Sequence, residues 1–355
     1  MTDELDIPAS AYEPKPWWDR RPSDERIQEV LGFILRTGKP YLWPGQTYDR
    51  PLNDSHIEYL AEFCLPSNRP LVPCPCCTPR HPKYRRGMIA YFPEEKTIRI
   101  MGHDCFKSIN AHGHTEALRK YHAELQRKKD VIYLLENLDN VPELISIIEH
   151  AAPVGHAVDE FRNNACKVFR EALHIDLWEH IRTGQLRIAR IRTQVIQIPG
   201  RGEETRDIEI VETYGTITGQ DFLKARSPRL GLKLDNALVA LRQIDFGPKF
   251  NERVAQMTDS DRRQTASLLG RALKTANEVF ALIDELRQFT SPATIATLNG
   301  WARIAECPIH MRLAFDGSSL HVGKREHDYR RIEVPAPYLV VLKRLPTIRV
   351  KSDVA

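Results

Sequence analysis

Three cysteines fall within four residues of this chain, at positions 74, 76 and 77. Cys74 and Cys77 form a C-x2-C pair, whose intervening turn aims both thiolates at one metal ion. A histidine and a further cysteine, His103 and Cys105, stand close together about 30 residues later. Thiolates combined with an imidazole are typical ligands of zinc. The sequence therefore predicts one structural zinc ion bound by Cys74, Cys77, His103 and Cys105.

The elements between these two ligand pairs are predicted to form a short hairpin. Residues 88–92 and 97–101 have the composition of strands around a turn, and a helix is expected to begin near Asp104. This order of knuckle, hairpin and helix resembles the treble-clef zinc finger over about residues 72–115. The resemblance implies two ligands from the knuckle and two from the helix end. Treble clefs commonly carry a second C-x2-C pair, where this chain has His-x-Cys. This departure concerns His103 as the fourth ligand. The alternatives to His103 are Cys76, His81, His112 and His114.

Other chemistry is less well supported by the sequence. The mixed nitrogen and sulfur ligands, without the spacing of a four-cysteine cluster, favour zinc over iron–sulfur. Cys64, Cys166 and Cys307 stand among apolar residues and are predicted to be buried thiols. The chain has no phosphate-binding P-loop, no Gly-x-Ser-x-Gly and no His-Glu-x-x-His. We therefore expect a non-enzymatic protein, with a metal-dependent hydrolase or nuclease as an alternative.

Positive charge is concentrated beside the predicted zinc module. Residues 80–130 hold twelve Lys or Arg and six Asp or Glu, a local net charge of +6 against +4 for the whole chain. Basic side chains interleaved with an aromatic suit phosphate neutralisation and base stacking. The predicted nucleic-acid contacts are Arg80, Lys83, Tyr84, Arg85 and Arg86. The alternative is a protein–protein adaptor or assembly component that uses the zinc module and amphipathic helices, with self-association through those helices.

Composition limits the class of protein. Hydrophobic residues make up 42% and charged residues 28% of the 355 positions, as in globular proteins of two or three domains. The start of the chain is acidic, and no apolar run reaches the roughly 20 residues that a membrane-spanning helix needs. An odd, uneven set of seven cysteines argues against a disulfide framework. We expect a cytoplasmic protein without a membrane segment.

The hydrophobic pattern predicts an α+β fold in four regions. Residues 1–70 form an arm and short helices, at 23–36 with Ser23 as N-cap and from 53 or 54 to 64. The zinc module occupies 71–115. A helical region covers 116–185, with helices at 115–138, 142–150 and 156–183. The mixed α+β region 186–355 contains a long helix at 260–290.

Antiparallel β hairpins are expected near 188–218 and 308–345, with a last strand at 338–342, and these are predicted to join in one small sheet. Helix 260–290 either pairs with helix 115–138 as an antiparallel coiled coil or packs on that sheet. Over its full length the chain looks similar to uncharacterised bacterial or phage proteins.

Overall fold

The computed structural model describes residues 17–74, 76–173, 177–199, 202–224, 229–244, 249–325 and 328–346. The chain divides into two compact units, Met1–Lys129 and Asp130–Ala355. Both contain helices together with antiparallel strands, which confirms the predicted α+β class. The boundary at residue 129 falls within helix α3 (Ala111–Asn137).

The first unit is built on a three-stranded antiparallel sheet in the order β1-β4-β5. Its strands are β1 (Glu58–Cys64), β4 (Arg86–Phe92) and β5 (Thr97–Gly102). The expected hairpin of β4 and β5 is confirmed, with Lys96 at positive φ in its turn. A separate pair, β2 (Val72–Cys74) and β3 (Thr78–Tyr84), carries the cysteine segment. Both β2 and helix α2 (His103–Ile109), which follows β5 directly, border the sheet, so the unit brings the two ligand segments together.

Helix α1 (Asp24–Thr37) begins where the sequence predicts. The Ser23 side chain accepts a hydrogen bond from the backbone N–H of Arg26, and Gly38 ends the helix in the left-handed conformation. Ile27, Val30 and Ile34 are buried on one face. A short 3-10 turn, η2 (Pro40–Leu42), follows. These local capping signals fix both ends of the helix.

The predicted helix from 53 or 54 to 64 is wrong, because this segment forms strand β1. Its residues include helix formers, but Tyr59, Ala61 and Phe63 are all buried in the sheet. A bulge between Tyr59 and Ala61 disturbs the alternation that would have marked a strand. Pairing with β4 decides the conformation, and this pairing is not visible in the local sequence.

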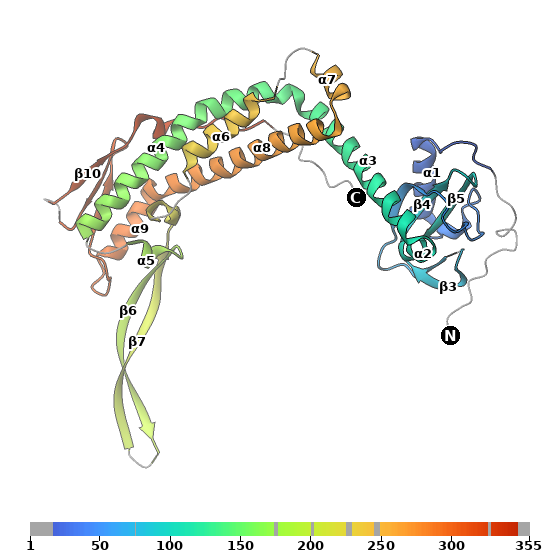
Figure 1. Cartoon of the computed structure of the whole chain (residues 1–355). Coiled ribbons are helices and arrows are strands. Elements are labelled where there is room, and N and C mark those ends of the chain that lie inside the picture. The colour runs from blue at the N-terminus through green and yellow to red at the C-terminus, as the bar shows by residue number, and fades with distance from the viewer. Residues whose placement is uncertain are drawn as a thin grey trace. The chain divides into compact units, whose positions relative to one another are not determined.

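The second unit is a helical bundle with two small sheets. After a 3-10 turn, η3 (Leu138–Asn140), its long helices are α4 (Val141–Leu173), α6 (Leu230–Arg242) and α8 (Asp259–Arg287), which run side by side in Figure 1. Shorter helical elements complete it: α5 (Leu177–Ile181), η4 (Gln220–Leu223), α7 (Phe250–Gln256), η5 (Gln288–Thr290) and α9 (Pro292–Ala302). Helix α8 packs on α6 and α4. Its buried stripe, which includes Leu269, Ala276 and Ile283, therefore packs mainly on α6 and α4. This differs from both expectations, which were packing on a sheet or on the helix at 115–138.

Helix α4 replaces the two helices expected at 142–150 and 156–183. It continues through Pro153, although an internal proline removes one backbone hydrogen bond. Residues on both sides of Pro153, Ala152 and Val154, are buried. Gly155 approaches Gly231 of α6 so closely that an added Cβ would lie 2.9 Å from the Gly231 nitrogen. Packing of α4 on α6 thus holds the helix together across the proline.

The predicted single sheet is wrong, because the two hairpins belong to separate sheets. Strands β6 (Gln185–Ile198) and β7 (Gly202–Thr216) form a two-stranded ribbon. Strands β8 (Arg312–Phe315), β9 (Ser319–Gly323) and β10 (Arg330–Glu333) form a three-stranded sheet in the order β10-β9-β8. The expected strand at 338–342 is also wrong. The 3-10 turn η6 (Ala336–Leu339) stands there, since Tyr338 is buried against Phe161 and bonds the Thr290 hydroxyl at 3.1 Å.

Candidate metal centre

Three thiols meet at one point in the first unit. The Sγ atoms of Cys74, Cys77 and Cys105 all lie within 4.8 Å of one another. Cys74 ends β2, Cys77 lies in the turn before β3, and Cys105 lies in the first turn of α2. The sulfurs of Cys77 and Cys105 lie 3.3 Å apart. This grouping is compatible with a small metal-binding module.

The local backbone explains how the thiols converge. The Cys77 N–H donates to the Cys74 carbonyl at 3.4 Å, which closes the turn and brings both side chains to one side. Gly102 leads from β5 into α2, and an added Cβ there would lie 2.9 Å from the Tyr84 ring. A residue without a side chain is therefore needed where the strand passes Tyr84. Cys105 then follows on the first helical turn.

The thiols of Cys74 and Cys105 shift the pKa of one another. Hydrogen bonds from the thiols of Cys105 and then Cys77 lower the pKa of Cys74 to about 6, against the opposing effect of burial. The pKa of Cys105 is raised well above its usual range, first because its thiol keeps the proton that bonds Cys74. Cys74 and Cys105 are buried, with 0% and 1% exposed surface. Negative charge at buried sulfur needs a nearby cation, which a metal ion would provide.

His103 lies outside the three-thiol group. Its Nδ1 is 3.8 Å from the Asp104 carboxylate, and its ring contacts the His114 ring edge-on at 4.7 Å between centroids. His114 is buried and shares a hydrogen bond of 2.5 Å with the Tyr59 hydroxyl. Burial, followed by the charge of Cys74, raises the pKa of the Cys76 thiol. His81 and His112 are exposed. Which of these completes the site stays a prediction.

The residues predicted to contact nucleic acid lie in different environments. Lys83 is exposed, with its Nζ 3.9 Å from the Cys77 sulfur. Arg86 is exposed and pairs with Glu62, while the Arg85 guanidinium donates to the Arg69 carbonyl at 2.9 Å. Tyr84 is buried between Gly87 and Gly102, so its ring belongs to the core. The side chain of Arg80 lies outside the described part of the structure.

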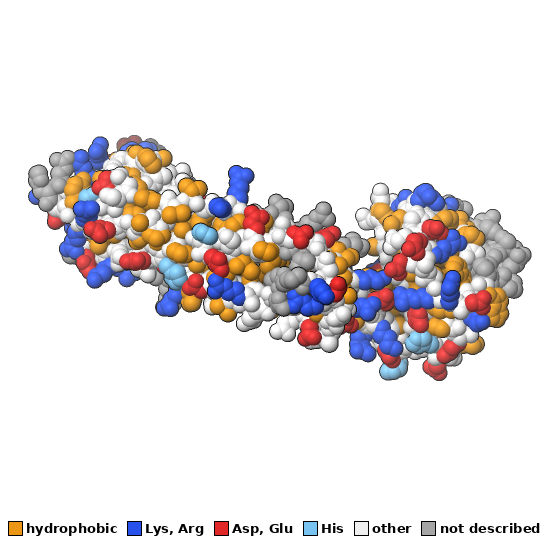
Figure 2. Space-filling model, turned by 90° about the horizontal axis from the view of Figure 1, so that it is seen from above, with side chains coloured by type: hydrophobic (Ala, Val, Ile, Leu, Met, Phe, Trp, Pro, Cys, Tyr) orange, Lys and Arg blue, Asp and Glu red, His pale blue; other side chains and the backbone are white. Residues whose placement is uncertain are grey.

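One basic residue near the thiols is not among the contacts that the sequence predicts. Lys107 is exposed on α2, two positions after Cys105. The sequence could have indicated Lys107, because it lies in the basic stretch and close to the predicted ligand Cys105. On the face of the first unit seen in Figure 2, basic side chains lie among acidic ones. Ion pairs of the first unit include Lys96 with Asp19 and Lys128 with Asp24.

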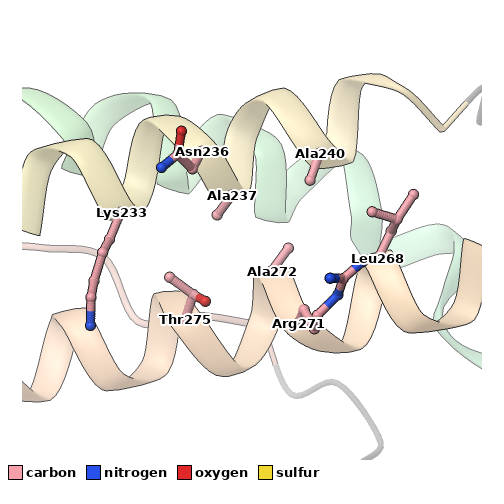
Figure 3. A pocket seen from close by; sticks show the side chains of 8 residues that line it. All are labelled: Lys233, Asn236, Ala237, Ala240, Leu268, Arg271, Ala272 and Thr275. Atoms are coloured by element: carbon pink, nitrogen blue, oxygen red, sulfur yellow. The ribbon is translucent and has the colours of Figure 1, made fainter.

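The second unit contains a groove between α6 and α8, shown in Figure 3. It has a volume of about 320 Å³ and is lined by apolar, uncharged polar and basic side chains, among them Ala237, Ala272, Lys233 and Arg271. None of the residues that line it is acidic, a histidine or a cysteine. The groove therefore offers no acid–base pair and no metal ligands of these types.

Comparison with known proteins adds no assignment, because no protein-family model, curated protein or solved structure matches the chain. Within the described residues, helices with enough length and hydrophobicity to cross a bilayer are absent. The cysteine group is therefore the feature from which a function must be argued.

Proposed function

We propose that this chain is a non-enzymatic zinc protein, in which a structural zinc ion organises a basic surface that contacts nucleic acid. The observation that carries the proposal is the convergence of Cys74, Cys77 and Cys105 within 4.8 Å. Two of these residues lie on one short hairpin, and the third comes from a helix 28 positions further along the chain than Cys77. The approach of Cys105 to the other two is therefore a product of folding rather than of sequence proximity.

Zinc fits this donor set best among the common metals. Thiolates select zinc, copper(I) and iron–sulfur clusters, whereas calcium and magnesium require oxygen ligands. Structural zinc sites use four protein ligands, in which cysteines stand alone or are combined with one or two histidines. Three cysteines and His103, two residues before Cys105, would make such a set with a single histidine. His103 keeps 30% of its side-chain surface exposed, so its ring has room to turn.

The fourth ligand is tested by cobalt substitution. Cobalt(II) bound by three sulfurs and one nitrogen absorbs differently from cobalt bound by three sulfurs and water. His103→Ala is expected to change the visible spectrum and to weaken metal binding, while His122→Ala, at an exposed histidine on α3 that is not a ligand candidate, leaves both unchanged. An unaltered spectrum in His103→Ala would remove His103 from the ligand set and return Cys76, His81, His112 and His114 to consideration.

Nucleic acid is supported as the partner by the charge around the module. The net charge of +6 over residues 80–130 is more positive than that of the entire chain. Lys83, Arg86 and Lys107 are exposed around the thiol group, on β3, β4 and α2. Cationic side chains that neutralise phosphates supply most non-specific affinity for nucleic acids.

A salt titration of binding to single- and double-stranded oligonucleotides tests this partner. Wild-type affinity is expected to fall steeply with salt. The double variant Arg86→Gln/Lys107→Gln is expected to bind more weakly with a shallower slope, by about 0.9 for each duplex phosphate that it no longer neutralises. Arg263→Gln/Lys274→Gln removes the same charge from exposed positions on α8 and should bind like wild type.

Zinc content must be equal in all of these variants for the comparison to hold. Absence of binding by zinc-loaded wild type at low salt would overturn the nucleic-acid part of the proposal. The zinc site would stand on its own measurements in that case, and a protein partner for the module would be the next hypothesis.

A further inference from the structure

The ribbon of β6 and β7 is anchored to the second unit only at its base. Leu186 and Ile188 are buried there, and the Trp301 indole of α9 donates to the Arg187 carbonyl at 3.0 Å. Beyond this base, residues 191–196 of β6 and 202–207 of β7 are all exposed. Figure 1 shows the ribbon extending away from the bundle at the end where α5 and α9 lie. Each strand therefore presents one outer edge that no other described strand covers.

One face of the exposed part of the ribbon combines apolar side chains with the acidic Asp207 and Glu209. Because paired residues lie on the same side of a sheet, the register from Ala189↔Val211 to Val195↔Thr205 places Ile191, Val195 and Val211 together. These three side chains are 75%, 56% and 58% exposed. A two-stranded ribbon without further strands or a covering helix is marginally stable in water. The ribbon is thus a surface that gains stability when another strand pairs with it.

The two strands carry opposite charges. Strand β6 has three arginines and no acidic residue, a charge of +3, at Arg187, Arg190 and Arg192. Strand β7 has one arginine, Arg206, and five acidic residues, a charge of −4, at Glu203, Glu204, Asp207, Glu209 and Glu212. With Arg201 between the strands, residues 185–216 carry no net charge, which gives a polyanion such as nucleic acid no net attraction. Within one ribbon, Arg190 and Arg192 both pair with Glu212, at 3.5 and 3.1 Å. Between ribbons, the remaining charge makes each edge repel a copy of itself and attract the other edge.

We propose that the partner of the ribbon is the ribbon of a second copy of this chain, with the outer edge of β6 pairing antiparallel with the outer edge of β7 in the other copy. Because β6 and β7 are themselves antiparallel, ribbons joined in this way point in the same direction. Each added copy leaves one β6 edge and one β7 edge free. Such a head-to-tail contact is heterologous, so it closes into a ring or continues as an open array.

Charge exchange between the strands tests the pairing. The variant Arg190→Glu/Arg192→Glu makes both edges acidic, and Glu203→Lys/Glu204→Lys/Glu209→Lys makes both edges basic. Full-length wild type is expected to sediment as assemblies larger than a monomer that dissociate with dilution and salt. Each variant alone is expected to sediment as a monomer. An equimolar mixture should assemble again, because the acidic edges of one variant meet the basic edges of the other.

Matched controls separate the ribbon from general charge effects. Arg263→Glu/Lys274→Glu and Glu160→Lys/Glu252→Lys/Glu278→Lys make the same charge changes at exposed helical positions and should assemble like wild type. A monomeric wild type at low salt would overturn the proposal. Assembly that persists in both ribbon variants, or a mixture that stays monomeric while circular dichroism shows folded protein, would also overturn it. Disulfide cross-links between Thr193→Cys on β6 and Thr205→Cys on β7 of separate copies report the pairing directly.

Discussion

At the scale of single residues, the metal centre depends on Cys105. Cys74 and Cys77 share one turn, but Cys105 reaches them only because β5 passes into α2 beside β2. Its sulfur lies 3.3 Å from that of Cys77 and its side chain is buried. Sulfurs at this separation repel one another once they are deprotonated, unless a cation lies between them. Cys105 is therefore the residue whose replacement tests the site most directly.

Cys105→Ser is expected to remove nearly all bound zinc, because hydroxyl oxygen is a much poorer zinc ligand than thiolate. The measurement is the zinc content of purified protein by elemental analysis. Cys64→Ser is the matched control. The prediction that Cys64 is buried is wrong, because it is the exposed last residue of β1, and it lies outside the three-thiol group. Equal zinc in the two variants would contradict a role for Cys105 as ligand.

At the scale of elements, close approaches of backbone decide several positions. Gly219 precedes η4 with φ of +70°, and an added Cβ would lie 2.4 Å from the Phe289 nitrogen and 2.8 Å from the Glu285 carbonyl oxygen. The end of α8 and the turn η5 thus press directly on this glycine. Gly317 has φ of +88° in the turn between β8 and β9, but open space surrounds its Cβ position.

Replacement by alanine is expected to lower the free energy of unfolding by different amounts at the two glycines. Gly317→Ala should lower the free energy of unfolding by about 1–2 kcal/mol, the strain of a left-handed residue with a side chain. Gly219→Ala should cost more than about 3 kcal/mol, because backbone atoms must also move. Denaturant unfolding of the two variants, followed by circular dichroism, measures both values. Equal costs would show that the contact with α8 adds nothing to the strain.

At the scale of the whole molecule, the chain has two compact units with separate cores. The thiol group belongs entirely to the first unit, and the ribbon belongs entirely to the second. A ligand that binds only the folded state stabilises the unit that binds it. Metal binding and self-association are therefore expected to act on different parts of the chain.

Zinc removal by a strong chelator should reduce amide protection in β2, β3 and α2, while the helices α4 and α8 keep theirs. Hydrogen exchange followed by mass spectrometry resolves these segments. Chelation of Cys105→Ser should cause no further change, which excludes a direct effect of the chelator. Loss of protection along α8 as well would show that the two units are coupled.

Local signals were enough to predict part of this protein. Ser23 and Gly38 fix α1 because caps act on the backbone groups next to them. The stripe that includes Leu269 and Ile283 predicted the long helix 260–290, now α8. The turn between β4 and β5 was also recognisable. In the metal centre, the C-x2-C pair predicted Cys74 and Cys77, and the resemblance to a treble clef implied Cys105.

The sequence by itself thus determined the α+β class, the cysteine group and the helices whose caps and periodicity are local. Only the tertiary structure decided that β1 is a strand, since pairing with β4 buries Tyr59 and Phe63. It also decided that α4 continues through Pro153, because Gly155 packs on α6. The tertiary structure likewise decided that the ribbon and the C-terminal sheet are separate, which the local sequence does not show. In each case the deciding energy comes from contacts between residues distant in the chain, which no local pattern records.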